Sequence, residues 1–192
     1  AVTVDNGFMS DQARVNSKAV TGALGVDYQL FTPAWSFMSG MYKESVSNPE
    51  LHTKAAIKRA SAIYNSCIGL INVYMIRLAL MHGAKLIAGG YIGGQVPKDT
   101  AILELNLDLY MKTREATIGR YETSFGEDTR KYFDIPEGLL QASQMKKITI
   151  LNPMLALNIG EEDIIAQLAP LGWKPTLDTG RNSSNCRSMT SI

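Results

Sequence analysis

Residues 48–90 read NPELHTKAAIKRASAIYNSCIGLINVYMIRLALMHGAKLIAGG and carry the strongest structural pattern in the chain. Asn48 suits a helix N-cap, Pro49 suits the first helical position, and Glu50 complements the positive end of a helix. Apolar side chains then recur at helical spacing, at Ala56, Ala60, Ile63, Cys67, Ile71, Tyr74, Leu78 and Met81. A glycine pair closes the stretch. This pattern predicts one helix over about residues 49–88.

Such a helix would be about 60 Å long at 1.5 Å per residue, which exceeds the diameter of a small domain. It would therefore break near Gly69 or Gly83, or project and pack against other chains. The predicted fold is mainly α-helical. A helical core, residues 32–172, lies between an extended N-terminal arm, residues 1–31, and a polar C-terminal tail, residues 173–192.

One segment, residues 102–110, fits two structures. Leucines alternate with polar side chains at the period of a strand, yet leucine and glutamate favour helix. We expect a helix over about residues 100–120. The alternative is an α+β fold whose small sheet uses residues 102–110 and 148–159. Three shorter helices are expected, over about residues 33–45, 139–147 and 161–168.

Composition narrows the class of protein. With 192 residues and 45% hydrophobic content, the chain can form one globular core. With a net charge of +1, the chain as a whole is not attracted to nucleic acid or anionic lipid, so such binding needs a local cluster of basic side chains. Cys67 and Cys186 lie far apart, and we expect a buried thiol at Cys67 and no disulfide framework. Ala1–Asp11 shows no secretory signal pattern, so an intracellular reducing compartment or a virion is expected.

A membrane span is the first alternative to a buried helix. Residues 63–81 are long enough to cross a bilayer and are mostly apolar, but Asn65, Asn72 and Arg77 interrupt them. A cation within a span costs on the order of 2.5–3.5 kcal/mol, although Arg77 lies near one end and could snorkel. We therefore favour a buried helix, and an accessory subunit of a membrane complex is the alternative.

Motifs for catalysis are weak. The glycine run 89–94 lacks the Lys-Ser/Thr pair of a phosphate-binding loop and follows a predicted helix, so we expect a structural turn. His52 and His82 have no metal-type partner three or four residues away, and no metal or cofactor is predicted. Glu104 and Asp108 would share a helix face, which leaves an enzyme with an unrecognised acid/base pair as the second alternative.

Cations and aromatic rings interleave between residues 112 and 147. Cations neutralise phosphates and aromatic rings stack on unpaired bases, so this mixture suits single-stranded nucleic acid. Basic residues at 54–59 could extend the same groove. The predicted contacts are Lys54, Lys58, Arg59, Arg114, Arg120, Tyr121, Arg130, Lys131, Tyr132 and Lys147. Acidic residues among them nearly cancel the local charge, so ordinary surface ion pairs are the competing interpretation.

These features favour a structural assembly subunit over an enzyme. Arms at both ends, a helix too long for its domain and nine methionines indicate contacts with neighbouring chains. The most specific form is a coat or nucleocapsid-type protein that polymerises around single-stranded RNA or DNA and contacts its own copies through the arms. The run YFDIPEGL, residues 132–139, is similar to segments of flexuous filamentous virus coat proteins, but it is too short to place the chain in a family. Assembly is expected to weaken when residues 1–31 are removed.

Overall fold

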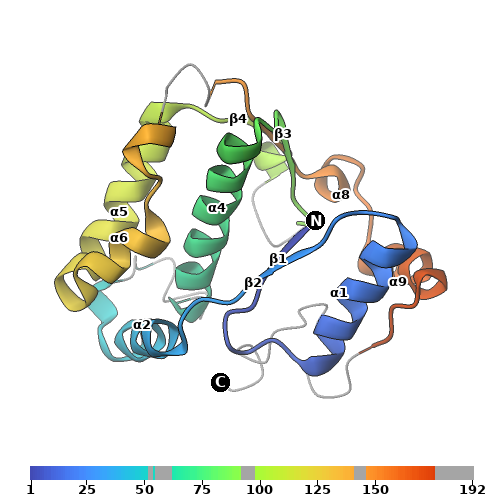
Figure 1. The fold of residues 1–192 in the computed structure, drawn as a ribbon, viewed down its shortest axis with the longest axis horizontal. Helices are drawn as coiled ribbons and strands as arrows, with labels where there is room; N and C mark the ends of the chain where they lie inside the picture. Colours follow the sequence, from blue (N-terminus) through green and yellow to red (C-terminus); the bar gives the residue numbers. More distant parts are fainter. Residues whose placement is uncertain (52–53, 55–61, 92–97, 141–145, 176–192) are drawn as a thin grey trace. The chain divides into compact units, whose positions relative to one another are not determined.

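The chain forms two compact units, each mainly α-helical with short strands (Figure 1). The first combines Ala1–Met38 with Ile159–Ile192, and the second is Ser39–Asn158. The structure is a computed structural model that describes residues 1–51, 54, 62–91, 98–140 and 146–175.

The first unit contains a short parallel strand pair joined by a helix. β1 (Val2–Val4) lies beside β2 (Gln29–Phe31), and α1 (Asp11–Ala23) connects the two strands. In the C-terminal part of this unit, α9 (Glu161–Leu168) leads into the 3₁₀ turn η4 (Ala169–Leu171), which packs on α1. The position of α9 confirms the helix predicted there.

The N-terminal segment, residues 1–31, is not the extended arm expected from the sequence. The Ser10 hydroxyl caps α1 by accepting a hydrogen bond from the Ala13 N–H (3.1 Å). Along α1 only Ala13 and Asn16 are buried. Because α1 buries so few side chains, it lacks the apolar stripe by which a sequence pattern reveals a helix. Residues 176–192 of the predicted polar tail lie outside the described residues.

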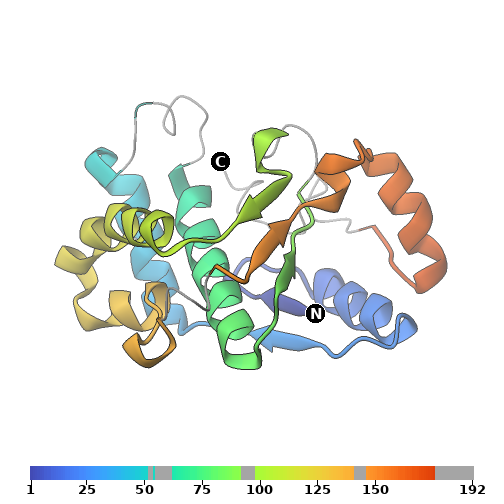
Figure 2. The same ribbon diagram turned by 90° about the horizontal axis from the view of Figure 1, so that it is seen from above.

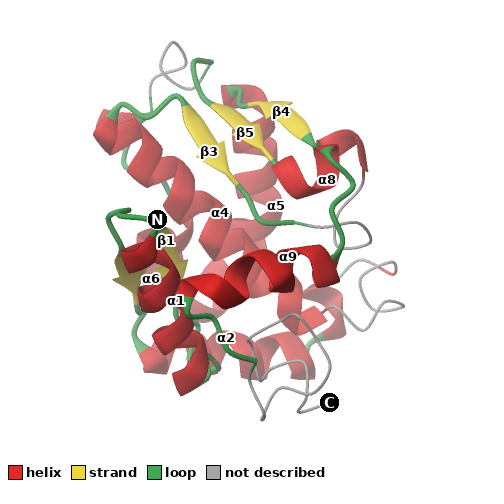
Figure 3. Cartoon of the chain, turned by 90° about the vertical axis from the view of Figure 1, so that its right-hand side faces the viewer, coloured by secondary structure: helices red, strands yellow, loops and turns green. Residues whose placement is uncertain are grey.

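The second unit packs α4 (Ala62–His82) and α5 (Leu107–Phe125) with a three-stranded sheet. In that sheet β5 (Thr149–Leu151) lies in the middle, parallel to β3 (Leu86–Ala88) and antiparallel to β4 (Ile102–Glu104) (Figure 2 and Figure 3). The buried residues of the shared core are Ile76, Ala79, Ile87, Leu105, Tyr110, Ile135 and Ile148. Further described elements are α2 (Trp35–Ser47), η1 (Pro49–Leu51), η2 (Lys98–Thr100), α6 (Glu127–Phe133), η3 (Glu137–Leu139) and α8 (Pro153–Ala156).

The single helix predicted over residues 49–88 is not what the structure has. Most of the segment between η1 and α4 lies outside the described residues, and α4 ends before Gly83. Gly83 is left-handed (φ +64°), and the Ala84 N–H donates to the Ala79 carbonyl (2.8 Å), which closes the helix end. The break expected near Gly83 is therefore confirmed. The apolar residues that follow form β3 because they pair with β5.

Segment 102–110 contains both of the structures that its sequence allows. Its first residues form β4, where the strand period is correct, and α5 begins at Leu107. Within the predicted sheet segment 148–159, β5 is a strand, whereas Pro153 starts α8. The fold is therefore mainly α-helical with a small sheet. The helix expected over residues 139–147 falls largely outside the described residues.

The apolar segment 63–81 lies within α4. Among the described residues, no helix combines the length and the apolar character needed to cross a membrane. Cys67, Leu70 and Ile76 of α4 are buried in the fold. Cys67 is buried and, within the described part of the chain, belongs to no disulfide, which confirms the buried thiol predicted for that cysteine.

Candidate nucleic-acid interface

Most of the predicted contact residues lie in the second unit. Arg114 and Tyr121 come from α5, which packs beside α6, and α6 supplies the run Arg130–Tyr132 (Figure 1). Lys147 lies just before β5. Lys54 is exposed, whereas Lys58 and Arg59 lie outside the described residues. Only the backbone of Arg120 is described, as part of α5.

Arg114 is held by Asp134 at the end of α6. Its Nε donates to Asp134 Oδ1 (2.7 Å) and its Nη2 donates to Oδ2 (2.5 Å), so the pair is bidentate. The Tyr110 hydroxyl donates to the same Oδ1 (3.2 Å) and accepts from the Ile135 N–H (3.0 Å). Arg77 of α4 donates to the Asp134 carbonyl. Asp134 therefore joins the end of α6 to α5 through its carboxylate and to α4 through its backbone carbonyl, and this cluster is structural.

The ionisation of this cluster follows from its contacts. Burial raises the pKa of Tyr110 to about 12, in spite of the hydrogen bond from the Ile135 N–H. Burial alone would raise the pKa of Asp134, but the hydrogen bonds and charge of Arg114 outweigh it and the pKa is lowered. The same hydrogen bonds raise the pKa of Arg114. At neutral pH the Arg114 charge is therefore matched by Asp134 and is poorly placed to attract a phosphate.

The two predicted stacking tyrosines belong to the interior. Tyr121 is buried, its ring stacks on Phe133 with centroids 6.0 Å apart and planes 9° apart, and its hydroxyl shares a hydrogen bond with Ser45 (2.9 Å). Tyr132 is also buried, with the Lys131 ammonium 5.3 Å from its ring centroid. In this conformation neither ring is open for stacking on a base. The alternation of cations and aromatics in the sequence reflects a helix pair with rings inside and charges outside.

Four of the predicted cations whose side chains the structure describes lie at the surface. Lys54, Lys131 and Lys147 are exposed. Arg130 is exposed too, and its Nε donates to Glu122 (2.5 Å), which raises the pKa of Arg130. Exposed pairs of this kind are weak and exchange readily with other partners.

Metal and acid/base chemistry receive little support in the described part of the chain. There, no three His, Cys, Asp or Glu side chains group as a metal site would require. Glu104 is in β4 and Asp108 is in the first turn of α5, so they do not share a helix face. The sequence predicts a helix directly before the glycine run 89–94. Gly89 instead follows the strand β3, so that prediction is wrong.

Sequence reasoning missed Lys85, which lines a small cavity together with Lys147. The two lysines lie far apart in the sequence, and each comes just before a strand. Only the pairing of β3 with β5 brings them together, and no spacing rule in the sequence reveals that pairing.

No protein-family model, curated protein or solved structure matches this chain. Function must therefore be argued from its own residues.

Proposed function

We propose that the chain is a structural subunit that assembles with copies of itself and holds single-stranded nucleic acid, in the manner of coat and nucleocapsid proteins. One observation carries the assembly half of this proposal. The first unit leaves large apolar side chains in water, with exposed fractions of 56% at Val15, 57% at Leu24, 46% at Val26 and 55% at Trp35.

The same unit buries few apolar side chains. Of its described residues, the buried apolar ones are Ala13, Pro33, Phe37 and Met38. Fully burying a large apolar side chain contributes about 1.5–3 kcal/mol, so four exposed ones leave a substantial driving force unused. A neighbouring chain that covers them would recover it, and exposed apolar patches commonly mark protein–protein contacts.

The nucleic-acid half rests on the exposed cations of the second unit. Three exposed lysines can contact phosphates directly: Lys54, Lys131 and Lys147. Arg130 can exchange its surface ion pair with Glu122 for a phosphate. The buried tyrosines contribute no stacking in this proposal. Binding would therefore be mainly electrostatic, sequence-tolerant and weakened by salt.

The decisive experiment measures the size and composition of the native material, purified without detergent. Sedimentation gives the particle mass, and the ratio of absorbance at 260 nm to that at 280 nm reports nucleic acid. The proposal expects a large particle with excess absorbance at 260 nm that falls when salt is raised. A small, monodisperse species at high concentration would overturn the assembly half. A large particle without the excess would overturn the nucleic-acid half alone.

A further inference from the structure

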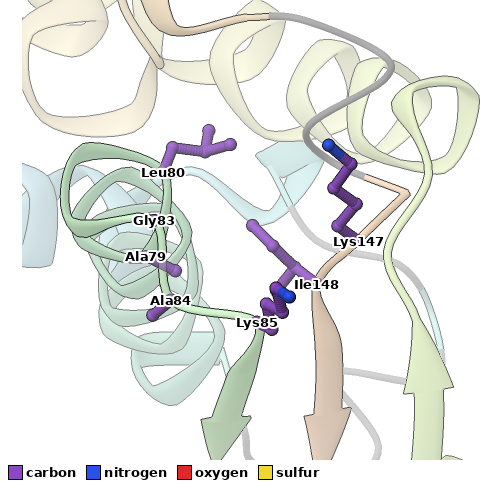
Figure 4. Close-up of a pocket in the computed structure, with 7 residues that line it drawn as sticks. All are labelled: Ala79, Leu80, Gly83, Ala84, Lys85, Lys147 and Ile148. Carbon is purple, nitrogen blue, oxygen red and sulfur yellow. The ribbon is translucent and has the colours of Figure 1, made fainter.

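Two lysines that precede different strands line a cavity of about 130 Å³ where α4 ends and β3 and β5 begin (Figure 4). Lys85 directly precedes β3, and Lys147 lies just before β5. The Thr149 N–H donates to the Lys85 carbonyl (2.9 Å), which holds the starts of the two strands side by side. Backbone pairing therefore brings two cationic side chains to one cavity.

The lining of the cavity mixes polar and apolar surface. Its apolar side chains include Leu80 in α4, Ala84 just after α4, and Ile148 directly before β5 (Figure 4). Ile148 is buried and belongs to the core of the second unit. Both lysines are exposed, so their attraction for an anion is of the strength found at a protein surface and weakens as salt is added.

Two carbonyl groups at the end of α4 already accept hydrogen bonds. The Ala79 carbonyl accepts from the Ala84 N–H (2.8 Å), and the Leu80 carbonyl accepts from the Gly83 N–H (3.4 Å). These bonds form the left-handed helix end. The charged groups among the lining residues are the two lysine ammonium groups.

Among the described residues, no ion pair involves Lys85 or Lys147. The residue before Lys147 is a further cation, Lys146. Two positive charges beside one cavity, without an ion pair to a described residue, favour an anion in it.

The volume of the cavity and its lysine ammonium groups indicate which anion fits. The volume of about 130 Å³ is well below the roughly 300–1,000 Å³ of pockets for drug-sized ligands, and it holds several waters at about 10–15 Å³ each. Lysine ammonium groups act as point charges with three donors, which suits the oxygens of a phosphate. We propose that this cavity binds a phosphate group. The site does not depend on assembly, so it goes beyond the proposed function.

Titration calorimetry of the full chain with inorganic phosphate, at low ionic strength, tests the site. Lys85→Gln and Lys147→Gln each remove one charge and keep most of the side-chain length. Lys43→Gln is the matched control, because Lys43 is exposed on α2, which lies by the other end of α4 (Figure 1). Each site variant should weaken phosphate binding about tenfold or more, and the control should leave it unchanged.

Absence of saturable phosphate binding to the unmodified chain would overturn the proposal. Equal weakening by Lys43→Gln and the two site variants would also overturn it, because that result indicates a diffuse charge effect. Circular dichroism of each variant ensures that a loss of binding is not a loss of fold.

Competition then identifies the source of the phosphate. An oligothymidylate without terminal phosphates displaces inorganic phosphate if a nucleic-acid backbone occupies the site, and thymidine monophosphate alone displaces it if a small phosphate ester does. Both results support the site, but only the first connects it to the proposed function. If native particles contain nucleic acid, yet the chain freed of nucleic acid binds no inorganic phosphate, the site is overturned and the proposed function stands.

Discussion

Asn16 and Lys174, 158 positions apart in the sequence, exchange two hydrogen bonds. The Asn16 side-chain amide donates to the Lys174 carbonyl (2.7 Å), and the Lys174 N–H donates to Asn16 Oδ1 (3.0 Å). Gln12, one turn earlier in α1, donates to the same oxygen (2.9 Å). Asn16 is buried, so its one side chain satisfies both backbone groups of Lys174 and joins the two chain segments of the first unit.

Replacing Asn16 by alanine should therefore destabilise the first unit. The change removes two hydrogen bonds to the backbone of Lys174, and each contributes about 0.5–1.5 kcal/mol, because Lys174 is exposed and water can reach the groups that are released. Chemical denaturation measures the loss, and hydrogen exchange should show reduced protection of the Lys174 amide. Asn72→Ala is the control, because Asn72 is exposed on α4. If both variants unfold at the denaturant concentration of the unmodified chain, the link does not stabilise the fold.

Asp134 predicts a pH dependence of stability. Its pKa is lowered in the folded chain, so it stabilises the fold above its unfolded pKa of about 3.9. That contribution is lost as the pH falls through the lower folded value. Asp134→Asn should reduce the free energy of unfolding by about 1–3 kcal/mol at pH 7, because Arg114 and Tyr110 lose a charged acceptor.

The difference in the free energy of unfolding between Asp134→Asn and the unmodified chain should shrink below about pH 4, because Asp134 takes up a proton there when the chain unfolds. Denaturation curves from pH 2.5 to 7 measure this convergence. Asp99→Asn, at an exposed position in η2, makes the same chemical change as a control. A difference that stays constant across the range would assign the loss to packing instead of charge.

The sequence predicts the elements whose ends are marked by proline, glycine or asparagine. α2 and α9 are bounded by proline and glycine, and β5 precedes an Asn-Pro turn. It fails where an apolar run crosses from helix to strand, as it does after Gly83, since Leu, Ile and Ala fit both structures. It also fails at α1, whose inward face includes the polar Asn16.

The candidate interface was predicted less well, because burial depends on tertiary packing. Tyr121 and Tyr132 stand beside cations in the sequence, and only the packing of α5 on α6 shows that the rings point inward. Likewise, Arg114 and Asp134 are 20 residues apart. No local pattern in the sequence indicates this ion pair. From the sequence alone, Arg114 cannot be told apart from an unpaired cation.

Gly89 predicts a sharp steric effect at the end of β3. A Cβ atom there would lie 2.2 Å from Asn152 Oδ1. Asn152 is buried and anchored, with its Nδ2 donating to the Thr100 carbonyl (2.8 Å) and its N–H donating to the Ala101 carbonyl (2.8 Å). Since it has little room to move, Gly89→Ala should cost about 1–3 kcal/mol.

The neighbouring glycine provides the control for that substitution. A Cβ on Gly90 would meet nothing within 4 Å, so Gly90→Ala should change stability by no more than about 0.5 kcal/mol. Thermal denaturation of the two variants measures the difference. Equal melting temperatures would mean that the turn after β3 adjusts to the extra methyl group.

The exposed apolar turn of the first unit gives the most direct test of assembly. Leu24 ends α1, Gly25 is left-handed (φ +63°), and Val26 follows. Both apolar side chains are about half exposed, so Leu24→Glu combined with Val26→Glu should leave the isolated fold intact. In an interface the two charges would lose hydration, which opposes association.

Sedimentation at increasing concentration should show that this double variant needs at least about ten times more protein to assemble, because burying each apolar side chain contributes about 1.5–3 kcal/mol. Val46→Glu is the matched control, since Val46 is 67% exposed on α2 and belongs to the second unit. Selective loss in the double variant would locate the contact at the first unit. Equal loss in both would indicate a general effect of added negative charge. Unchanged assembly in both would exclude the turn from the interface and remove the main support for the proposed contact.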